Sequence, residues 1–379
     1  MRARSALAGT AAALLSLALA APATAAAARG GHGHDATRGA VQAQVAAGVP
    51  GVTLTAQDGR HTWRTTAGVG DLRTGAPRST ADHYRVGSIT KTFVATVLLQ
   101  LEAEGRLSLD DSVEHWLPGV LGTNGYDGSK ITLRMLLNHT SGVFNYTEDK
   151  SVAATYFTKE GFYTHRFDRV APRQLLAIAL AHEPYFAPGA SWHYSNTNYL
   201  LAAQVVEKVT GRPYGEEIRR RVIAPLHLTG TSVPGTRPTL PRPSSRAYGK
   251  LAEVTTGPTY DVTELNPALA YGSGEMVSDS ADLNRFYRAL LGGTLLPPRQ
   301  LAEMKTTVDA GDIPHARYGL GLMERELSCG VRVWGHGGGI HGSASEAVTT
   351  ADGRHSLAFN LNSDWTGDTD AVVEAEFCG

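Results

Sequence analysis

VGSITKTF, residues 86–93, contains a Ser-x-x-Lys motif and leads into an apolar run that ends at Leu101. The apolar residues of this run recur at helical spacing, so Ser88 is expected at a helix N-terminus, with Gly87 allowing a tight turn before it. The first N–H groups of a helix are free and favour negative charge, which suits a nucleophilic oxygen. Lys91, three residues further on, lies on the same helix face, so its amine reaches the hydroxyl. The motif by itself is more often a capped helix with a solvated lysine.

The overall composition is that of a globular protein. The chain has 379 residues, of which 42% are hydrophobic and 19% charged, and its formal net charge is -1. This length permits one large or two modest domains with a sizeable core. The charge balance gives no support to binding of nucleic acid or of an anionic membrane.

The first residues resemble an export signal. Arg2 and Arg4 precede an apolar stretch at residues 6–21, and Ala-x-Ala sites follow it. This pattern predicts a signal peptide over residues 1–27 that is removed on secretion, although a tail or an anchor helix is an alternative. No other stretch is long and apolar enough to span a bilayer, so the mature protein is expected outside the cell without a stable membrane anchor.

Residues 28–38 are expected to form a flexible tail rich in glycine and histidine. Within it, His32, His34 and Asp35 are spaced like a metal-ligand set. A catalytic metal needs ligands on a rigid frame, whereas here glycines flank the residues and no strand precedes them. No metal and no other cofactor are therefore expected.

The two cysteines, Cys329 and Cys378, are predicted to pair. Export places them in an oxidising compartment, and the second lies at the C-terminus, which a disulfide would tie down. Two buried free thiols are the alternative. The closed loop of about 50 residues is worth on the order of 4 kcal/mol in the chain-entropy model.

Strand signals lie towards both ends of the chain, and helical signals fill the middle. A hairpin is expected at residues 52–69, where Asp58-Gly59 supplies the turn, and a second is indicated by Asp352-Gly353. Helices are expected at 39–48, 107–118, 131–137, 170–181, 200–209, 278–291 and 370–377, and late strands at 318–322, 331–334, 345–350 and 356–361. The order predicts an α+β fold in which both ends of the chain build one antiparallel sheet, flanked by helices, with a mainly helical region inserted. One domain over 39–379 is expected, strand-rich at about 39–105 and 265–379, with a helical subdomain at about 106–264.

Two further segments carry residues suited to acyl chemistry. In one, Tyr194 is a capable proton shuttle if neighbouring cations lower its pKa, and Asn196 offers an amide that binds a carbonyl or a lysine. In the other, WGHGGG at 334–339, glycines let a substrate approach the strand edge, and the Gly339 N–H joins that of Ser88 in an oxyanion hole. Each segment alone is also compatible with an ordinary loop or bulge. His139 follows a helix in a turn, where a structural role is expected.

Taken together, Ser88-x-x-Lys91, Tyr194-x-Asn196 and His336-x-Gly338 resemble the three motifs of the penicillin-recognising serine hydrolases. Their form and order are similar to those of the branch that holds secreted actinomycete D-Ala-D-Ala carboxypeptidases, class C β-lactamases and esterases. The resemblance extends from about residue 40 to the Cys329–Cys378 region and implies a β-lactamase/transpeptidase-like fold.

The resemblance also implies a role for each residue. Ser88 would form an acyl-enzyme, Lys91 and Tyr194 would share proton transfer without either being assigned as the resting base, and Asn196 would hold the substrate amide. His336 would polarise that side of the site. Substrate would lie against Gly338, Gly339 and Trp192.

Two departures from the D-Ala-D-Ala carboxypeptidases bear on the substrate. Gly337 and Gly339 stand where those enzymes carry hydroxyls, and Met323 stands where an arginine holds the terminal carboxylate, with Arg325 close by. A missing cation weakens recognition of a free carboxylate and favours a broader esterase, amidase or D-amino-acid peptidase activity.

The expected function is that of a secreted serine hydrolase, similar to a D-Ala-D-Ala carboxypeptidase acting on peptidoglycan-type peptides. An esterase, a class C-like β-lactamase or a D-amino-acid peptidase on the same site is the first alternative, and a non-catalytic β-lactam-binding protein is the second. The expected partners are a peptide or ester acyl donor and acylating β-lactams, not nucleic acid. The protein is expected to be a monomer.

Overall fold

The computed structural model describes residues 33–251, 256–311, 313 and 315–379, and residues 34–379 form one compact unit. The predicted signal peptide, residues 1–27, and the start of the predicted tail lie outside the described residues.

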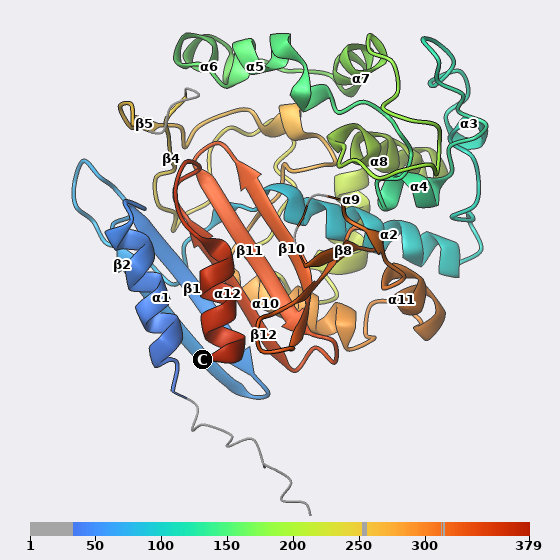
Figure 1. Ribbon diagram of the computed structural model, residues 1–379. Coiled ribbons are helices and arrows are strands. Elements are labelled where there is room, and N and C mark those ends of the chain that lie inside the picture. The colour runs from blue at the N-terminus through green and yellow to red at the C-terminus, as the bar shows by residue number, and fades with distance from the viewer. Residues whose placement is uncertain (1–32, 252–255, 312, 314) are drawn as a thin grey trace, which may run out of the picture. The chain divides into compact units, whose positions relative to one another are not determined.

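An antiparallel sheet built from both ends of the chain is the frame of this unit (Figure 1). Its strand order within the described residues is β2-β1-β12-β11-β10-β9-β8-β7, so the N-terminal hairpin pairs with the last strand through β1 and β12. The strands are β1 (Gly51–Asp58), β2 (His61–Gly68), β7 (Val308–Asp309), β8 (Ala316–Tyr318), β9 (Met323–Glu326), β10 (Arg332–Ile340), β11 (Ser343–Thr350) and β12 (His355–Leu361). The predicted α+β fold is confirmed.

Helices cover both faces of the sheet. On one face α1 (Asp35–Ala46) and α12 (Thr369–Cys378) lie side by side, over a core that includes Val52 and Leu54 (Figure 1). On the other face α10 (Ser280–Leu291) packs against β1, β11 and β12. Val52 and Leu54 of β1 belong to the core shared with α1, while the Asn284 side chain of α10 donates a hydrogen bond to the backbone carbonyl of Thr55.

The larger core lies between the sheet and the helices that follow Ser88. It contains α2 (Thr90–Ala103), which is buried from Thr90 to Leu99, and much of α8 (Asn196–Thr210). The other helices are α3 (Val113–Trp116), α4 (Leu133–Leu137), α5 (Lys150–Tyr156), α6 (Lys159–His165), α7 (Pro172–Leu180), α9 (Tyr214–Ile218) and α11 (Pro298–Met304). Two small strand pairs complete the fold: β3 (Tyr84–Arg85) with β6 (Val277–Ser278), and β4 (Tyr248–Gly249) with β5 (Tyr260–Asp261).

The structure corrects three local expectations. The first helix begins at Asp35, so the end of the predicted flexible tail is helical: His34 stacks on Trp63 and hydrogen-bonds Glu376. Residues 318–322 do not form a strand, because β8 ends at Tyr318 and a turn follows. The strand expected at 331–334 continues to Ile340, since glycines within β10 pair regularly with β11.

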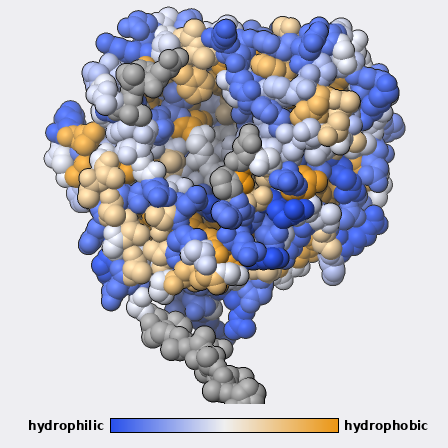
Figure 2. Space-filling model, in the orientation of Figure 1, coloured by the Kyte–Doolittle hydropathy of each residue, from blue (hydrophilic) through white to orange (hydrophobic). Residues whose placement is uncertain are grey.

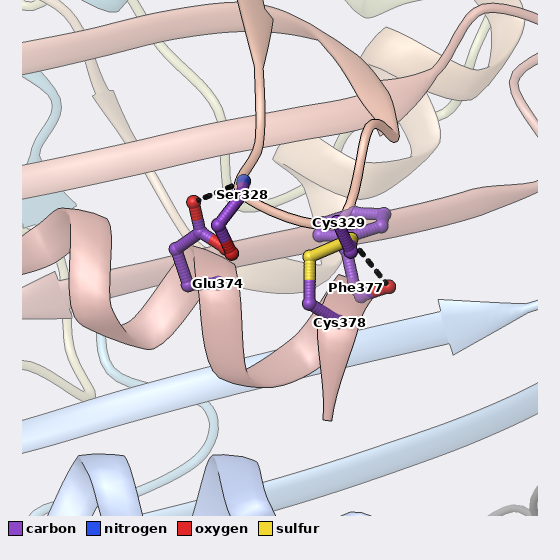
Figure 3. Close-up of a disulfide and its surroundings, with 5 residues drawn as sticks. All are labelled: Ser328, Cys329, Glu374, Phe377 and Cys378. Carbon is purple, nitrogen blue, oxygen red and sulfur yellow. Dashed lines mark hydrogen bonds between the residues drawn. A yellow bond between two sulfur atoms is a disulfide. The ribbon is translucent and has the colours of Figure 1, made fainter.

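The predicted disulfide between Cys329 and Cys378 is present, with the two Cα atoms 5.7 Å apart. It joins the loop between β9 and β10 to the end of α12 (Figure 3). Beside it, the backbone N–H and hydroxyl of Ser328 both donate to the Glu374 carboxylate. The C-terminal helix is therefore fixed covalently and by hydrogen bonds to the same loop.

Among the described residues no helix is both long enough and apolar enough to cross a membrane. On the face shown in Figure 2, hydrophilic and hydrophobic residues are interspersed.

Candidate active site

Ser88 lies in a tight turn directly before α2. The turn, Gly87–Ile89, is a single 3-10 turn that continues into α2, and Gly87 has φ +53°, a conformation that favours glycine. A side chain at Gly87 would also come within 2.8 Å of the Gly339 backbone N. The turn therefore needs glycine both for its conformation and for its contact with β10, as the sequence predicted for the tight entry.

Lys91 is buried, with no exposed surface, and its amine has three partners. Nζ lies 3.0 Å from Ser88 Oγ. It also lies 2.7 Å from Asn196 Oδ1 and 2.8 Å from the Ser273 carbonyl oxygen, which are acceptors only. A neutral amine has two hydrogens for these two acceptors, which leaves its lone pair for the Ser88 hydroxyl proton.

The electrostatics of Lys91 support the neutral form. Burial holds the pKa of the amine well below its ordinary value, because the charged form loses its hydration. No carboxylate pairs with Lys91 among the described residues. Lys91 Nζ thus lies within hydrogen-bond reach of the Ser88 hydroxyl, with a lowered pKa.

Asn196 is the first residue of α8, and hydrogen bonds at both the nitrogen and the oxygen of its side-chain amide fix its orientation. Its Nδ2 donates to Thr147 Oγ1 at 3.1 Å, while Oδ1 accepts from Lys91. Its backbone N–H donates to Asn145 Oδ1. One amide hydrogen remains for a substrate carbonyl, as the sequence predicted for this residue.

Tyr194 lies against the same amine, with Lys91 Nζ 4.8 Å from the ring centroid. Burial raises the pKa of its phenol, and the hydrogen bond to Ser88 acts in the opposite direction with a smaller effect. The expectation that nearby cations lower this pKa is therefore not met, since the neighbouring amine is itself neutral. Tyr194 keeps its proton and is suited to donate it.

The glycines of β10 let the strand approach the Ser88 turn. A side chain at Gly338 would come within 1.9 Å of the Val86 carbonyl oxygen and 3.0 Å of the Ser88 backbone N, whereas a side chain at Gly339 would meet nothing within 4 Å. Gly338 is thus required for close packing, and Gly339 borders open space. The backbone N–H groups of Ser88 and Gly339 come together at this point, where an oxyanion hole is expected.

His336 belongs to a buried chain of hydrogen bonds. His139 Nδ1 accepts from the Ser195 backbone N–H and from Asn198, so its Nε2–H donates to the Tyr318 hydroxyl at 3.2 Å. Tyr318 then donates to His336 Nε2 at 2.9 Å. Burial lowers the pKa of His336 to about 3. His336 is therefore neutral, and His139 has the structural role expected of it.

Neither departure from the carboxypeptidase pattern is compensated. Arg325 donates to Glu346 at 2.6 Å and also pairs with Asp370, so its charge is already matched. A side chain at Gly337 would meet Glu346 Oε2 at 2.7 Å, which places it beside this ion pair. Met323 is opposite Gly335 in the sheet.

A cavity of about 510 Å³ opens in front of Ser88. Ser88, Asn196 and Gly339 are among its lining residues, while Lys91 and His336 are buried behind it. The other residues that line it are Tyr146, Thr147, Phe157, Lys250, Leu251, Leu265, Pro267, Leu269, Ala270, Ser273, Gly274, Ile340, His341, Asp364 and Trp365.

Two predicted substrate-binding residues do not line this cavity. Gly338 packs on the Ser88 turn, and Trp192 packs with Tyr318 in a small cluster beside the sheet. The residues that sequence reasoning missed come from loops between helices and from the chain after β12. Ser273 contributes a backbone carbonyl, for which no side-chain motif exists.

Comparisons with known proteins give the family of the chain. The family model described as Beta-lactamase matches residues 37–374. Penicillin-binding protein 4* of Bacillus subtilis is 28% identical over 325 residues, which is 82% of this chain and 68% of that protein. Esterase EstB of Burkholderia gladioli is 34% identical over 184 residues, which is 48% of this chain and 46% of that protein.

Two solved structures are also similar. D-stereospecific amidohydrolase from Streptomyces sp. has a TM-score of 0.87 and 59% identity, covering 92% of this chain and 99% of that one. D-amino acid amidase from Ochrobactrum anthropi SV3 has a TM-score of 0.77 and 27% identity, covering 90% and 97%.

The fold, the three converging segments and these matches define a serine hydrolase of the β-lactamase and penicillin-binding protein superfamily. The chain belongs to the Beta-lactamase family, whose model spans most of its length.

Proposed function

We propose that the protein is an exported hydrolase of D-aminoacyl amides and esters that works through an acyl-enzyme at Ser88. The observation that carries this proposal is the arrangement at Lys91. Its amine is buried, hydrogen-bonds two carbonyl acceptors and lies 3.0 Å from the hydroxyl oxygen of a serine that faces the cavity, and burial lowers its pKa.

In the proposed acylation, Ser88 Oγ attacks the substrate carbonyl carbon while its proton passes to Lys91 Nζ. The C–O bond forms as the carbonyl π bond becomes an oxyanion, which the N–H groups of Ser88 and Gly339 bind. Collapse of the tetrahedral intermediate breaks the bond to the leaving nitrogen or oxygen. Tyr194 protonates that atom and takes a proton back from the Lys91 ammonium, so that the amine is neutral and the phenol protonated again before deacylation. Water then repeats the sequence on the ester and releases the acid. Each oxyanion donor is worth about 3 kcal/mol if typical.

We propose an amide or ester substrate, and not a peptide with a free C-terminal carboxylate, because of the cations that the site offers. A carboxypeptidase of the D-Ala-D-Ala type needs a cation for the terminal carboxylate, and Arg325 is already paired. Lys250 is the cation among the described lining residues, and its amine is held by the Gly257 carbonyl and Thr259. The names of the two similar structures, a D-stereospecific amidohydrolase and a D-amino acid amidase, point the same way.

The test compares three substrates at equal concentration: D-alanine p-nitroanilide, its L-enantiomer and a D-Ala-D-Ala peptide. We expect hydrolysis of the D-anilide, little of the L-anilide and slow release of D-Ala. Release of D-Ala faster than hydrolysis of the anilide would favour a carboxypeptidase acting on peptidoglycan-type peptides. No turnover of any of them, with stable acylation by penicillin, would favour a β-lactam-binding protein.

Export is part of the proposal and is supported by the pattern at residues 1–27 and by the disulfide, which forms in oxidising compartments. Sequencing the N-terminus of protein recovered from culture medium tests it. We expect a start near residue 28, and an intact Met1 on cell-retained protein would contradict export.

A further inference from the structure

A carboxylate stands in the substrate cavity and has no role in the chemistry above. Asp364 follows β12 and lines the same cavity as Ser88, next to Trp365. Asp364 is exposed, and Phe157 and Leu251 contribute apolar surface to the same cavity. An acidic group with an apolar approach is a common way to bind an amine on an alkyl chain.

The Asp364 carboxylate is held in one orientation by backbone groups. Its Oδ2 accepts the Gly342 N–H at 2.7 Å, in the turn between β10 and β11. A side chain at Gly249 would come within 3.0 Å of Oδ2 and 3.3 Å of Oδ1, so glycine there leaves room for the carboxylate. Burial raises its pKa, and backbone N–H groups of Gly342 and Lys250 lower it.

The charge of Asp364 has no counter-ion in the part of the chain that the structure describes. Lys250, its cationic neighbour in the cavity, directs Nζ elsewhere: to the Gly257 carbonyl at 2.6 Å and to Thr259 Oγ1 at 2.9 Å. The Lys250 amine also lies 4.8 Å from the Trp365 ring centroid. A cation that enters the cavity therefore finds an unmatched carboxylate.

The contact of Asp364 with the turn between β10 and β11 limits its distance from the oxyanion hole. The oxyanion hole is at Gly339, and Asp364 contacts Gly342 three residues further on, which spans at most roughly 11 Å. The terminal amine of an extended lysyl side chain lies within this limit from the scissile carbonyl.

We propose that Asp364 binds the side-chain ammonium of the acyl donor, so that the enzyme prefers D-aminoacyl substrates of the lysine or ornithine type. Phe157, Leu251 and Trp365 cover the methylene groups of that side chain. This inference rests on the proposed function and specifies the substrate class of the same site.

The experiment measures kcat/KM for D-lysine p-nitroanilide and D-norleucine p-nitroanilide, whose side chains differ by a terminal ammonium and a methyl group. Both are assayed with the wild-type chain, with Asp364→Asn and with Asp35→Asn, whose side chain is 93% exposed on α1. Asparagine keeps an oxygen for the Gly342 N–H. We expect Asp364→Asn to lose at least 10-fold on the lysyl substrate and less than 2-fold on the norleucyl one, and Asp35→Asn to change neither.

A binding measurement separates this inference from the proposed function. Calorimetry with D-lysinamide and D-norleucinamide uses Ser88→Ala and the double variant Ser88→Ala/Asp364→Asn, in which turnover plays no part. A preference for D-lysinamide that disappears in the double variant supports the subsite. Equal binding of both amides in both proteins, or equal loss of kcat/KM on both anilides, overturns it, whereas a wild-type chain inactive on both anilides counts against the proposed function.

Discussion

At the scale of single residues, the reactivity of Ser88 depends on the protonation of Lys91. Burial lowers the pKa of the amine, and its two carbonyl partners can accept both hydrogens of the neutral form. The motif Ser-x-x-Lys does not by itself require that the lysine amine be buried between two carbonyl groups. The third partner, the Ser273 carbonyl, is separated from Lys91 by 182 residues and is brought to it by the fold.

The pH dependence of kcat/KM follows from this assignment. A protonated amine accepts no proton, so activity rises with pH through the pKa of Lys91, and that midpoint lies well below the ordinary lysine value of 10.5. His336, with a pKa of about 3, is already neutral over this range. We expect one ascending limb in the profile, measured with a neutral ester.

Tyr194→Phe serves as the control for that profile. The pKa of Tyr194 is raised, so the variant loses rate but keeps the midpoint of the ascending limb. A midpoint near 10.5 in the wild-type protein would mean that Lys91 is charged at neutral pH and would refute the assignment.

At the scale of elements, the catalytic geometry depends on how closely β10 approaches the turn before α2. Two adjacent glycines differ in what surrounds them: Gly338 faces the Val86 carbonyl, and Gly339 faces the open cavity. They provide a matched pair of alanine substitutions.

Gly338→Ala is expected to displace β10 from Ser88. Overpacking costs about 1–3 kcal/mol of stability, and a shift of about 1 Å in the oxyanion donor lowers kcat by roughly 100-fold. Gly339→Ala retains its N–H and changes stability by less than about 0.5 kcal/mol. Thermal unfolding and ester kinetics measure both, and similar behaviour of the two variants would show that the close approach at Gly338 does not matter.

Sequence reasoning succeeded where a local pattern determines the element. The hairpin at Asp58-Gly59, the helix after Ser88 and the N-terminal position of the Tyr194-x-Asn196 segment all follow from short-range signals. It failed at β10, because a run of glycines has no strand propensity and becomes a strand only through pairing with β11. It also placed the end of the flexible tail too late, since α1 begins at Asp35 and packs against α12, an element more than 300 residues away.

The same limit applies to the site. Residues with a motif, such as Ser88, Lys91 and Asn196, could be predicted. The cavity walls could not, because Phe157, His341 and Asp364 come from separate loops that meet only in the folded chain. The family resemblance implies that Trp192 contacts substrate, but its ring packs beside the sheet.

At the scale of the whole molecule, the two ends of the chain are joined through the sheet and its covering helices. The Cys329–Cys378 disulfide closes a loop of 49 residues, for which the chain-entropy model gives about 4 kcal/mol. It lies on the α12 side of the sheet, away from the cavity in front of Ser88.

We therefore expect the double variant Cys329→Ala/Cys378→Ala to unfold about 5 °C lower than the wild type by calorimetry, with unchanged kcat/KM at 25 °C. Ser328→Ala, which removes an exposed hydrogen bond in the same loop, should shift the midpoint by much less. An unchanged midpoint in the cysteine double variant would show that the loop is already constrained in the unfolded chain.

The most direct test of the mechanism follows the mass of the intact protein over time after mixing with penicillin or with an active D-aminoacyl ester. We predict a single acyl adduct on the peptide that contains Ser88, no adduct in Ser88→Ala, and acylation slowed by at least 100-fold in Lys91→Ala. An adduct of the same mass in Ser88→Ala, or wild-type acylation in Lys91→Ala, would contradict the account.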